Sequence, residues 1–329
     1  MATIGDVARE AGVSRSTVSS VLTGRKYVAP HTRMRIEKAI KKLDFTVNSG
    51  ARALATSRTM TLGLALSFEA TQYISTASTY IVNIAERARQ LGYRLTIMTD
   101  DDGVSEIRSC LASKAVDGLL LMELVEDDPR IDVLRGSDTP AVLVGMPSDT
   151  RGVDAIDFDY TAGGTLAVER LYAQGASKIA FVTWPEAVYA KGATYAIRAR
   201  AAAEERAREL GVPLDLYPCA SKPRAMQRLL HSILEDHSYD GLLFHNDAAA
   251  PILGELLARH HRTGPAVTGL CSARVAHEHW LPFETIDTRP HDSTWAAVEL
   301  LVGRLEGRVG PETRLLLEPL INEAAQPDD

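Results

Sequence analysis

The sequence predicts a two-part fold, in which a small all-α headpiece precedes a two-lobed α/β domain built from parallel, doubly wound sheets. Short amphipathic segments punctuated by glycine occupy residues 1–46, and apolar strands alternate with amphipathic helices from residue 61. Residues 1–60 hold eleven Lys or Arg and four Asp or Glu, whereas the rest of the chain holds 25 and 39. The first segment therefore has a net charge of +7 and the rest of the chain one of −14. A cationic segment on an anionic chain is typical of a separate module that binds a polyanion. The alternative explanation for the positive charge is a solvated charged helix face.

The composition is that of an ordinary globular chain of two or three domains. Its 329 residues are 45% hydrophobic and 24% charged, and no stretch approaches the roughly 20 apolar residues that span a bilayer. Asp6 and Arg9 interrupt any N-terminal apolar run, which argues against a secretory signal. Cys110, Cys219 and Cys271 are odd in number and widely spaced, which fits a reducing compartment. We therefore expect a cytoplasmic chain without a membrane segment, a metal or a cofactor.

Three short helices are expected within residues 1–46. Thr3 and Ser14 can cap the first two helices, Gly12 ends the first, and a third runs from about 32 to 43. The inner face of the second helix is expected to hold Val18, Val21 and Leu22. The apolar residues of the third helix are Met34, Ile36, Ala39, Ile40 and Leu43. Two short helices joined by a turn that contains glycine, with a third helix beneath them, form a helix-turn-helix.

The second of these helices should place its N-terminal end in a DNA major groove. Arg15 is the best candidate for a bidentate contact to guanine. Ser16 and Ser20 can bond several bases, so they specify sequence weakly, and Ser20 is alternatively a small residue at a close helix approach. Thr17 can offer its methyl group to thymine or its hydroxyl to phosphate. Ser14 is favoured as a helix cap over a base reader.

The headpiece sequence resembles a known family. Residues 3–19, TIGDVAREAGVSRSTVS, and residues 21–24, VLTG, are similar almost position for position to the opening of the LacI/GalR (lactose-repressor) family. The resemblance implies a sequence-specific DNA-binding transcription regulator, not an enzyme, and favours a homodimeric repressor of a palindromic operator. It implies that Arg15, Ser16 and Ser20 read bases. Ser20 is shorter than the polar residues common at its position, which leaves the operator sequence open.

Residues 47–60 resemble the hinge helix of the same family. By that resemblance Leu54 is an apolar wedge in the minor groove at the operator centre, with Ala51 and Arg52 at the groove floor and backbone. The segment is too short to be a stable helix alone, so it is expected to fold on DNA beside the hinge of a second subunit. Packing on the following domain is the alternative role for Leu54. Gly50 should weaken the free hinge by roughly 0.5–1 kcal/mol relative to alanine.

The rest of the chain alternates strands with helices, which predicts two doubly wound lobes. The expected helices include 80–91, 163–174 and 194–210, and the expected strands are 61–67, 94–99, 118–122, 141–145, 179–183, 241–245 and 266–270.

The resemblance continues over this part of the chain. Landmarks include Val116 to Leu121, Asp157 to Tyr160 and His245 to Asp247. It implies a periplasmic-binding-protein-like sensor whose N-terminal lobe takes residues 61–160 and 288–318 and whose C-terminal lobe takes residues 161–287 and 319–329.

A small-molecule effector is expected in the cleft between the lobes, because ligands of open α/β sheets bind beyond the carboxyl ends of the strands. Asp247 matches a ligand aspartate of the family or caps a helix at residue 248, and Arg198 is favoured over Arg200 as the ligand arginine. Trp184 can stack on a ring or pack in the core, and Arg289 can line the cleft or tie the lobes together. The full set of candidates is Phe68, Gln72, Tyr73, Trp184, Arg198, Asp247, Cys271 and Arg289.

Three features limit this interpretation. The loops that contain Phe68 and Cys271 lack the acidic residues usual in the family, which weakens the case for a plain sugar. Catalytic Gly-x-Ser-x-Gly, phosphate-binding Gly-x-x-x-x-Gly-Lys and strand-linked Gly-x-Gly-x-x-Gly motifs are absent from the sequence. His277 and His279 cannot chelate a metal from one helix face and are expected on a surface loop.

Two alternatives to this function remain. One is a regulator controlled by a protein partner or by no effector, and the other is a soluble ligand-binding or transport module.

Overall fold

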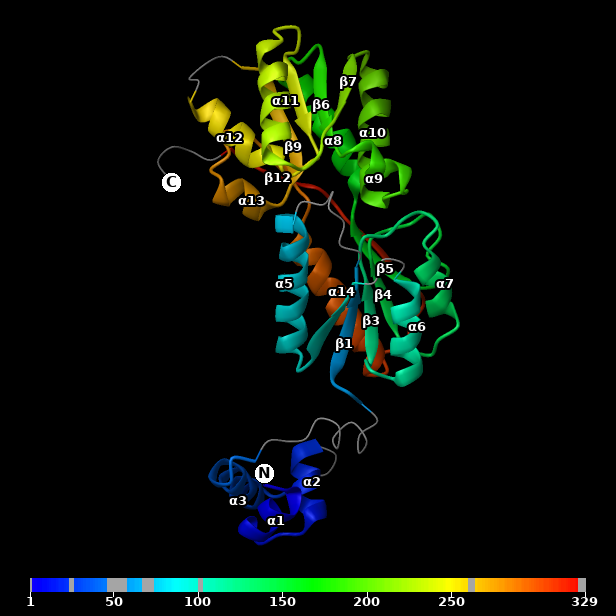
Figure 1. The fold of residues 1–329 in the computed structure, drawn as a ribbon, viewed down its shortest axis with the longest axis vertical. Coiled ribbons are helices and arrows are strands. Elements are labelled where there is room, and N and C mark those ends of the chain that lie inside the picture. The colour runs from blue at the N-terminus through cyan, green and yellow to red at the C-terminus, as the bar shows by residue number, and fades with distance from the viewer. Residues whose placement is uncertain are drawn as a thin grey trace. The chain divides into compact units, whose positions relative to one another are not determined.

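The structure is a computed structural model that describes residues 2–23, 27–45, 58–66, 74–99, 103–259 and 264–324 (Figure 1). At residues 23, 74, 75, 258 and 259 the description is limited to the backbone. The chain divides into two compact units, Met1–Thr61 and Leu62–Asp329. The hinge candidates Ala51, Arg52 and Leu54 and the cleft candidates Phe68, Gln72 and Tyr73 lie outside the described residues.

The first unit contains α1 (Ile4–Ala11), α2 (Arg15–Thr23) and α3 (Pro30–Lys42). Thr3 caps α1 as predicted, because its hydroxyl accepts a hydrogen bond from the backbone N–H of Asp6, whose carboxylate accepts from the backbone N–H of Thr3. Gly12 ends the helix in the left-handed conformation, with φ of 63°.

Apolar faces of the three helices meet in one small core. Val7 of α1, Val18 of α2 and Ile36 of α3 are fully buried there. Arg35 adds a polar tie, since its guanidinium donates to the carbonyl oxygen of Ala11 at 2.5 Å. Met34, although apolar, does not join this core, because its side chain is 67% exposed. Met34 lies two residues before Ile36, and positions two apart point to different sides of a helix.

The second unit is built on two six-stranded sheets. The first sheet has the order β11-β5-β4-β3-β1-β2, and every pairing described between its strands is parallel. Its strands are β1 (Thr61–Ala65), β2 (Arg94–Met98), β3 (Gly118–Leu121), β4 (Ala141–Val144), β5 (Asp154–Phe158) and β11 (Arg314–Leu317).

The second sheet has the order β12-β10-β9-β8-β6-β7, and only β12 runs antiparallel to its neighbour among the described pairs. Its strands are β6 (Ile179–Thr183), β7 (Leu214–Pro218), β8 (Gly241–Phe244), β9 (Ala266–Cys271), β10 (Thr285–Asp287) and β12 (Leu320–Asn322).

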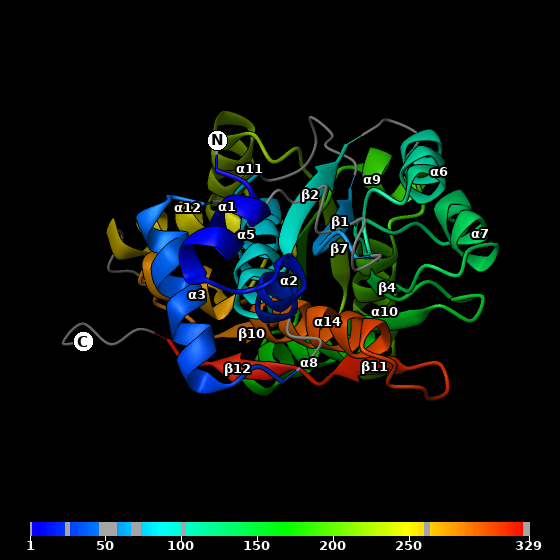
Figure 2. The same ribbon diagram turned by 90° about the horizontal axis from the view of Figure 1, so that it is seen from below.

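Helices cover both faces of each sheet, which buries the apolar strands from two sides (Figures 1 and 2). The first sheet packs against α5 (Ile74–Gln90) and α14 (Pro290–Leu305) on one face and against α6 (Val104–Ser113) and α7 (Pro129–Arg135) on the other. The second sheet is covered by α8 (Tyr160–Ala173) and α10 (Thr194–Leu210) on one face. Its other face holds α11 (Pro223–Glu235), α12 (Ala249–Arg259) and α13 (Ala273–Glu278), while the short α9 (Glu186–Ala190) precedes α10.

Three short segments cross between the two lobes: β5 to α8, β10 to α14, and β11 to β12. In Figure 2, β11 and β12 follow one another along one side of the domain as the outer strands of the two sheets. Each lobe therefore contains residues from distant parts of the sequence, and the crossing segments are the places where the lobes can pivot.

The doubly wound fold is as predicted, and the helix expected at 194–210 has those bounds. Strands β5, β7, β10, β11 and β12 were not predicted, because most are short and several mix charged with apolar residues. His277 is also a correction, since it lies in α13 and not in a loop.

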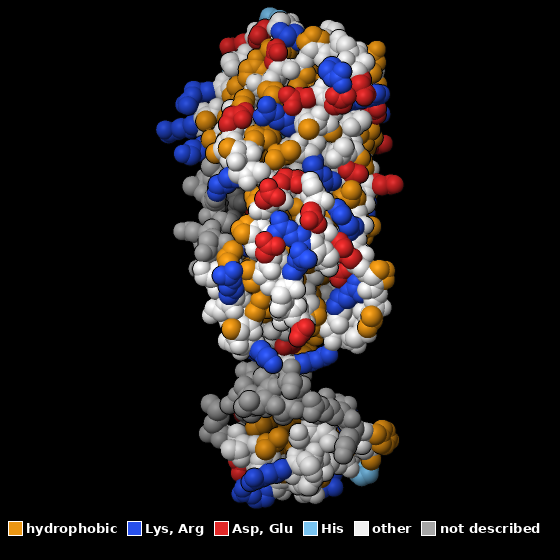
Figure 3. Space-filling view, turned by 90° about the vertical axis from the view of Figure 1, so that its right-hand side faces the viewer, with side chains coloured by type: hydrophobic (Ala, Val, Ile, Leu, Met, Phe, Trp, Pro, Cys, Tyr) orange, Lys and Arg blue, Asp and Glu red, His pale blue; other side chains and the backbone are white. Residues whose placement is uncertain are grey.

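Two properties of the surface bear on partners. On the face shown in Figure 3, the Lys and Arg side chains of the second unit are interspersed with Asp and Glu and do not gather in one basic patch. Within the described part of the chain, no helix combines the length and apolar character needed to cross a membrane.

Candidate functional site

The N-terminal end of α2 presents a group of small hydroxyls beside one guanidinium. Arg15 and Ser16 are exposed, and Thr17 and Ser20 are half-buried. The Ser14 hydroxyl accepts from the backbone N–H of Thr17 at 3.1 Å, which confirms its predicted capping role. The same hydroxyl lies 2.7 Å from those of Ser16 and Thr17, while Ser20 donates to the Ser16 carbonyl at 2.9 Å. The hydroxyls are thus held by one another and by the backbone, with lone pairs left for an incoming donor.

Arg15 is held against the first helix. A Cβ placed on Gly5 would lie 2.8 Å from a terminal guanidinium nitrogen of Arg15, so the side chain occupies the space that glycine leaves open. Hydrogen bonds from Thr3 hold the pKa of Asp6 below its usual value, and the charges of Arg9 and Arg15 add to that effect. The guanidinium of Arg15 is therefore exposed and lies against Gly5 of α1. Its paired N–H donors have the geometry that recognises guanine O6 and N7.

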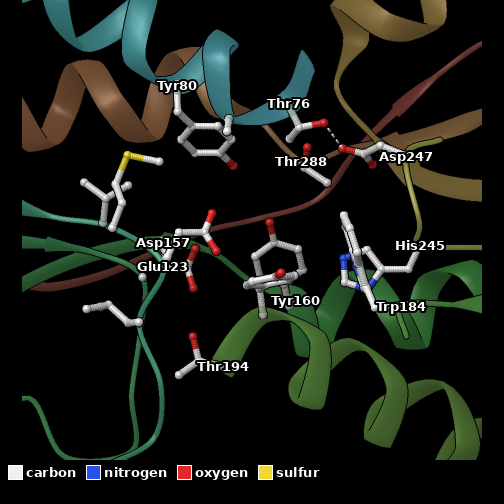
Figure 4. Close-up of a pocket in the computed structure, with 16 residues that line it drawn as sticks. Thr76, Tyr80, Glu123, Asp157, Tyr160, Trp184, Thr194, His245, Asp247 and Thr288 are labelled. Carbon is white, nitrogen blue, oxygen red and sulfur yellow. Dashed lines mark hydrogen bonds between the residues drawn. The ribbon is translucent and has the colours of Figure 1, made fainter. Parts of the chain in front are cut away.

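The second unit contains a cavity between its two lobes, with about 760 Å³ of empty space, part of it open to solvent (Figure 4). The cavity lies at the carboxyl ends of β3, β5, β6 and β8. Its walls are Thr76, Ala77, Tyr80, Met122, Glu123, Leu124, Val144, Gly145, Asp157, Tyr160, Trp184, Thr194, Tyr195, His245, Asp247 and Thr288.

Direct contacts between the lobes close one side of this cavity. Val125 and Ala193 form an antiparallel bridge, and the backbone N–H of Thr194 donates to the carbonyl of Leu124 at 3.2 Å. On another side the Thr76 hydroxyl of α5 donates to the carboxylate of Asp247 at 2.5 Å (Figure 4). The structure therefore holds the lobes together around the cavity.

Tyr80, Tyr160, Glu123 and Asp157 point their oxygens toward one another in the middle of the cavity (Figure 4). Burial raises the pKa of both tyrosines. Burial also raises the pKa of Asp157 to about 7, although the charge of Arg198 acts in the opposite direction.

Arg198 is the cation closest to this polar centre in the described contacts. Its guanidinium donates to Asp157 at 3.0 Å and lies 3.7 Å from Asp159, which caps α8. Because Arg198 belongs to α10 and Asp157 to β5, the ion pair is a third contact between the lobes. Arg198 is also 3.5 Å from the carbonyl oxygen of Met146. It reaches the cavity through Asp157 and is not itself part of the wall.

Asp247 follows β8 and is 7% exposed. Its carboxylate accepts from Thr76, and burial raises its pKa to about 7. The side chain that accepts from the backbone N–H of Ala248 at the start of α12 is Asn246, at 3.2 Å, while Asp247 lines the cavity. The carboxylate of Asp247 is therefore available to the cavity.

Aromatic rings line the wall beside Asp247. Trp184 is 6% exposed and packs edge-on against Tyr195 and His245, with ring centroids 5.7 and 6.0 Å away. Tyr160 lies 5.4 Å from His245. Burial lowers the pKa of His245 to about 3, so the imidazole is neutral near pH 7. Among the described residues, neither Trp184 Nε1 nor His245 Nδ1 has a hydrogen-bond partner.

A buried ion pair supports the strand end that carries Glu123. The backbone φ of this residue is 53°, a value that is unusual for residues other than glycine. Arg130 donates to the carbonyl oxygens of Met122 and Glu123, each at 3.0 Å, and Asp128 holds its guanidinium at 2.6 Å. The pair fixes the backbone turn that delivers Glu123 to the cavity.

The remaining predicted cleft residues lie away from the cavity wall. Cys271 is fully buried in the apolar core beneath α11 and α12, which corrects the expectation that its side chain lines the cleft. Arg289 bonds Asp292 at 2.7 Å and the carbonyl of Glu318 at 3.2 Å, so it ties two crossing segments together. Arg200 pairs with Glu186 and covers the ring of Tyr189, away from the cavity.

Sequence analysis did not identify most of the cavity wall. The missed polar and aromatic residues are Thr76, Tyr80, Glu123, Asp157, Tyr160, Thr194, Tyr195, His245 and Thr288. Asp157, Tyr160 and His245 fall in motifs noted as landmarks, and their positions at strand ends were a usable signal.

The chain matches the sequence profiles of two families. Residues 3–48 match bacterial regulatory proteins of the lacI family, and residues 168–323 match the periplasmic binding protein-like domain. The chain is 34% identical over 183 residues to catabolite control protein A of Staphylococcus xylosus, covering 55% of each chain. It is 34% identical over 191 residues to the HTH-type transcriptional regulator CelR of Thermobifida fusca, covering 56% of each. The matched region thus spans about half the length of these curated relatives.

The fold is similar to those of solved regulators. The Lac repressor dimer bound to operator and the anti-inducer ONPF matches with a TM-score of 0.78 and 22% identity, over 98% of each chain. The transcriptional regulator CelR–cellobiose complex matches with a TM-score of 0.65 and 23% identity, over 99% of each chain. At this level of identity the likeness shows a shared fold.

Proposed function

Because residues 3–48 match bacterial regulatory proteins of the lacI family, we propose that this chain is a cytoplasmic transcription repressor of that family and that it binds a palindromic DNA operator as a homodimer. A small molecule in the cavity between the lobes would set its affinity for the operator. The observation that carries the proposal is the exposed N-terminal end of α2, where the side chains of Arg15 and Ser16 are accessible to base edges. This end belongs to a cationic unit that is compact by itself.

DNA reading follows from the chemistry of that end. Arg15 would form a bidentate contact to guanine, while Ser16, Thr17 and Ser20 would add contacts that several bases or a phosphate can satisfy. The other Lys and Arg residues of the headpiece would neutralise phosphates and supply salt-dependent affinity. A structure of the Lac repressor with operator supports this mode for the shared fold.

The hinge would connect DNA reading to the sensor. We propose that residues 1–46 are the reader, residues 47–60 the hinge, and the two lobes the sensor, divided as residues 61–160 with 288–318 and 161–287 with 319–329. Leu54 would wedge a base step apart at the operator centre, between Ala51 and Arg52 at the groove floor and backbone.

The cavity provides the means of control. Thr76–Asp247, Arg198–Asp157 and the Val125–Ala193 bridge join the lobes around it. A ligand that binds Asp247 competes with Thr76 for the carboxylate, so it has different affinities for the joined and the parted arrangement. Such a difference is what a ligand needs in order to shift a conformational equilibrium and, with it, the pairing of the hinges.

Selection of preferred sequences from random duplex DNA by the full chain tests the proposal. We expect an inverted repeat to be enriched, and a footprint with distortion at its centre that disappears in Leu54→Ala. Equal, salt-sensitive binding to every duplex would refute sequence-specific regulation and favour a ligand-binding or transport module. Operator binding that no metabolite changes would instead favour control by a protein partner or by no effector.

A further inference from the structure

We propose that the ligand of the cavity is a small hydroxylated organic cation, with a protonated amine or quaternary ammonium placed against Asp247 and the neighbouring aromatic rings. The inference rests on the proposed function of this cavity as the effector site, and it names the class of effector. Four properties of the cavity carry it: its charge, its aromatic wall, its unpartnered nitrogens and its hydroxyl groups.

The described wall of the cavity is acidic, and one of its three carboxyl groups, that of Asp157, is paired with Arg198 from outside the wall. Glu123, Asp157 and Asp247 contribute carboxyl groups, and no Lys or Arg is among the wall residues that the structure describes. The nearest cation, Arg198, is shared between Asp157 and Asp159. The hydrogen-bond partner of Asp247 is the neutral hydroxyl of Thr76. A ligand cation would supply the charge that this buried carboxylate lacks.

Charge decides between ligand classes. A neutral polyol can donate hydrogen bonds to Asp247, but it leaves a buried carboxylate without an opposite charge, which is costly in a poorly hydrated site. The pKa of Asp247, raised to about 7 by burial, reflects that cost. An anionic ligand would meet the carboxyl groups of Glu123, Asp157 and Asp247 and is disfavoured wherever they are ionised. For a cationic ligand, in contrast, burial strengthens the electrostatic attraction between the ligand and the carboxylate of Asp247.

The aromatic wall suits a cation as well. Tyr160, Trp184, Tyr195 and His245 form a continuous cluster in which centroid distances between contacting rings run from 5.4 to 6.0 Å. The faces of such rings attract ammonium groups, and aromatic cages of this kind recognise quaternary ammonium ions. His245 is neutral near pH 7, so it adds no repulsion.

Two buried nitrogens indicate a hydroxyl on the same ligand. Trp184 Nε1 is a donor and His245 Nδ1 is either a donor or an acceptor, and both lack partners among the described residues. Trp184 is 6% exposed and His245 is 3% exposed, so bulk water does not readily satisfy them. A ligand oxygen beside the ammonium group would accept from Trp184. Hydroxyls of Thr194 and Thr288, also in the wall, offer further contacts.

Paired probes that differ in charge test the inference. Calorimetric titration of the full chain at pH 8 would compare D-glucosamine with D-glucose and choline with its neutral carbon analogue, 3,3-dimethylbutan-1-ol. Because the pKa of glucosamine lies below 8, its titration is repeated at pH 7. We expect at least one cation to bind roughly tenfold more tightly than its neutral partner, the factor that one well-placed charge contact of about 1.4 kcal/mol supplies.

Two variants assign the effect to the carboxylate. Asp247→Asn keeps the size of the side chain and an oxygen that can accept from Thr76, and it should reduce the preference for the cation to near unity. Asp236→Asn removes an exposed carboxylate at the end of α11 and should leave the preference unchanged. Near-ultraviolet circular dichroism of both variants checks that the aromatic cluster is intact.

Each result of these titrations decides the inference. The inference is overturned if the neutral partner binds more tightly in both pairs, or if cation and neutral partner bind equally. It is also overturned if neither cation binds up to 10 mM, which corresponds to about 2.7 kcal/mol of binding free energy. A preference that persists in Asp247→Asn also overturns it. Selection of an operator by the unliganded chain is measured separately, so that a failed ligand class leaves the proposed DNA-binding function standing, whereas a failed operator selection does not depend on these probes.

Discussion

The headpiece and the cavity of the second unit both present polar side chains to a partner, but they do so in opposite surroundings. Arg15 and Ser16 stand in solvent on a short helix, and their supporting contacts come from within 15 residues of chain. Asp157 and Asp247 are buried, and their contacts come from the other lobe. Exposed groups can be exchanged with little effect on folding, whereas the buried groups couple ligand binding to stability and to the arrangement of the lobes.

The largest expected effect of this difference lies in the buried ion pair that supports Glu123. Asp128→Ala leaves the guanidinium of Arg130 buried without its counter-charge, since the two side chains are 1% and 8% exposed. We expect a loss of about 3–5 kcal/mol in the free energy of unfolding, measured by urea denaturation. The matched exposed pair is Arg274–Glu278, where Glu278→Ala should leave the urea midpoint almost unchanged. Equal losses in the two variants would remove the contrast between buried and exposed pairs.

The next effect concerns DNA reading by an exposed side chain. Arg15→Ala should cost about 1–3 kcal/mol of discrimination between the preferred operator and one with a changed guanine, with little change in thermal stability. Titration of labelled duplexes at fixed salt measures it. Arg33→Ala, on α3, is the control for general charge and should weaken both duplexes alike. If Arg15→Ala behaved in the same way, Arg15 would be a phosphate contact.

The pH dependence of stability sharpens the comparison further. Asp157 and Asp247 have pKa values raised from 3.8 to about 7, so the folded chain holds more protons than the unfolded chain between those values. Their contribution to stability is present below pH 4 and is lost as the pH rises toward 7. His245 acts in the opposite sense, because its pKa is lowered to about 3 and its contribution is lost as the pH falls below 6.5.

Asp247→Asn isolates one of these groups, which faces Thr76, the tyrosines Tyr80, Tyr160 and Tyr195, and Cys271. We expect the variant to be more stable than the parent at pH 8, by on the order of 1 kcal/mol, and equally stable at pH 4. Melting temperatures across this range provide the measurement. A difference that did not change with pH would mean that Asp247 is ionised in the folded chain at all of these values.

The smallest effect is expected at Gly5. Alanine favours a helix by about 0.8–1 kcal/mol over glycine, but its Cβ would lie 2.8 Å from the guanidinium of Arg15 and displace it. Gly5→Ala should therefore leave the melting temperature unchanged or slightly raised and shift operator preference in the direction seen for Arg15→Ala. Unchanged preference would show that Arg15 reads DNA without support from α1.

The sequence by itself determined the headpiece and the class of the second unit. Caps at Thr3 and Ser14, the stop at Gly12 and the helix at 194–210 depend on neighbours within a few residues, so local patterns were sufficient. Strand–helix alternation predicted doubly wound sheets for a similar reason, since each unit buries its apolar face in the same way.

Only the tertiary structure decided the composition of the cavity. Thr76 meets Asp247 across 171 positions of sequence, and Asp157 meets Arg198 across 41, because a helix of each lobe reaches a strand end of the other. Burial cannot be seen in a local sequence pattern. It places Cys271 in the core, raises the pKa of Asp157 and Asp247, and lowers the pKa of His245. The dielectric surroundings of a side chain are a property of the folded chain, and the chemistry of the cavity depends on them.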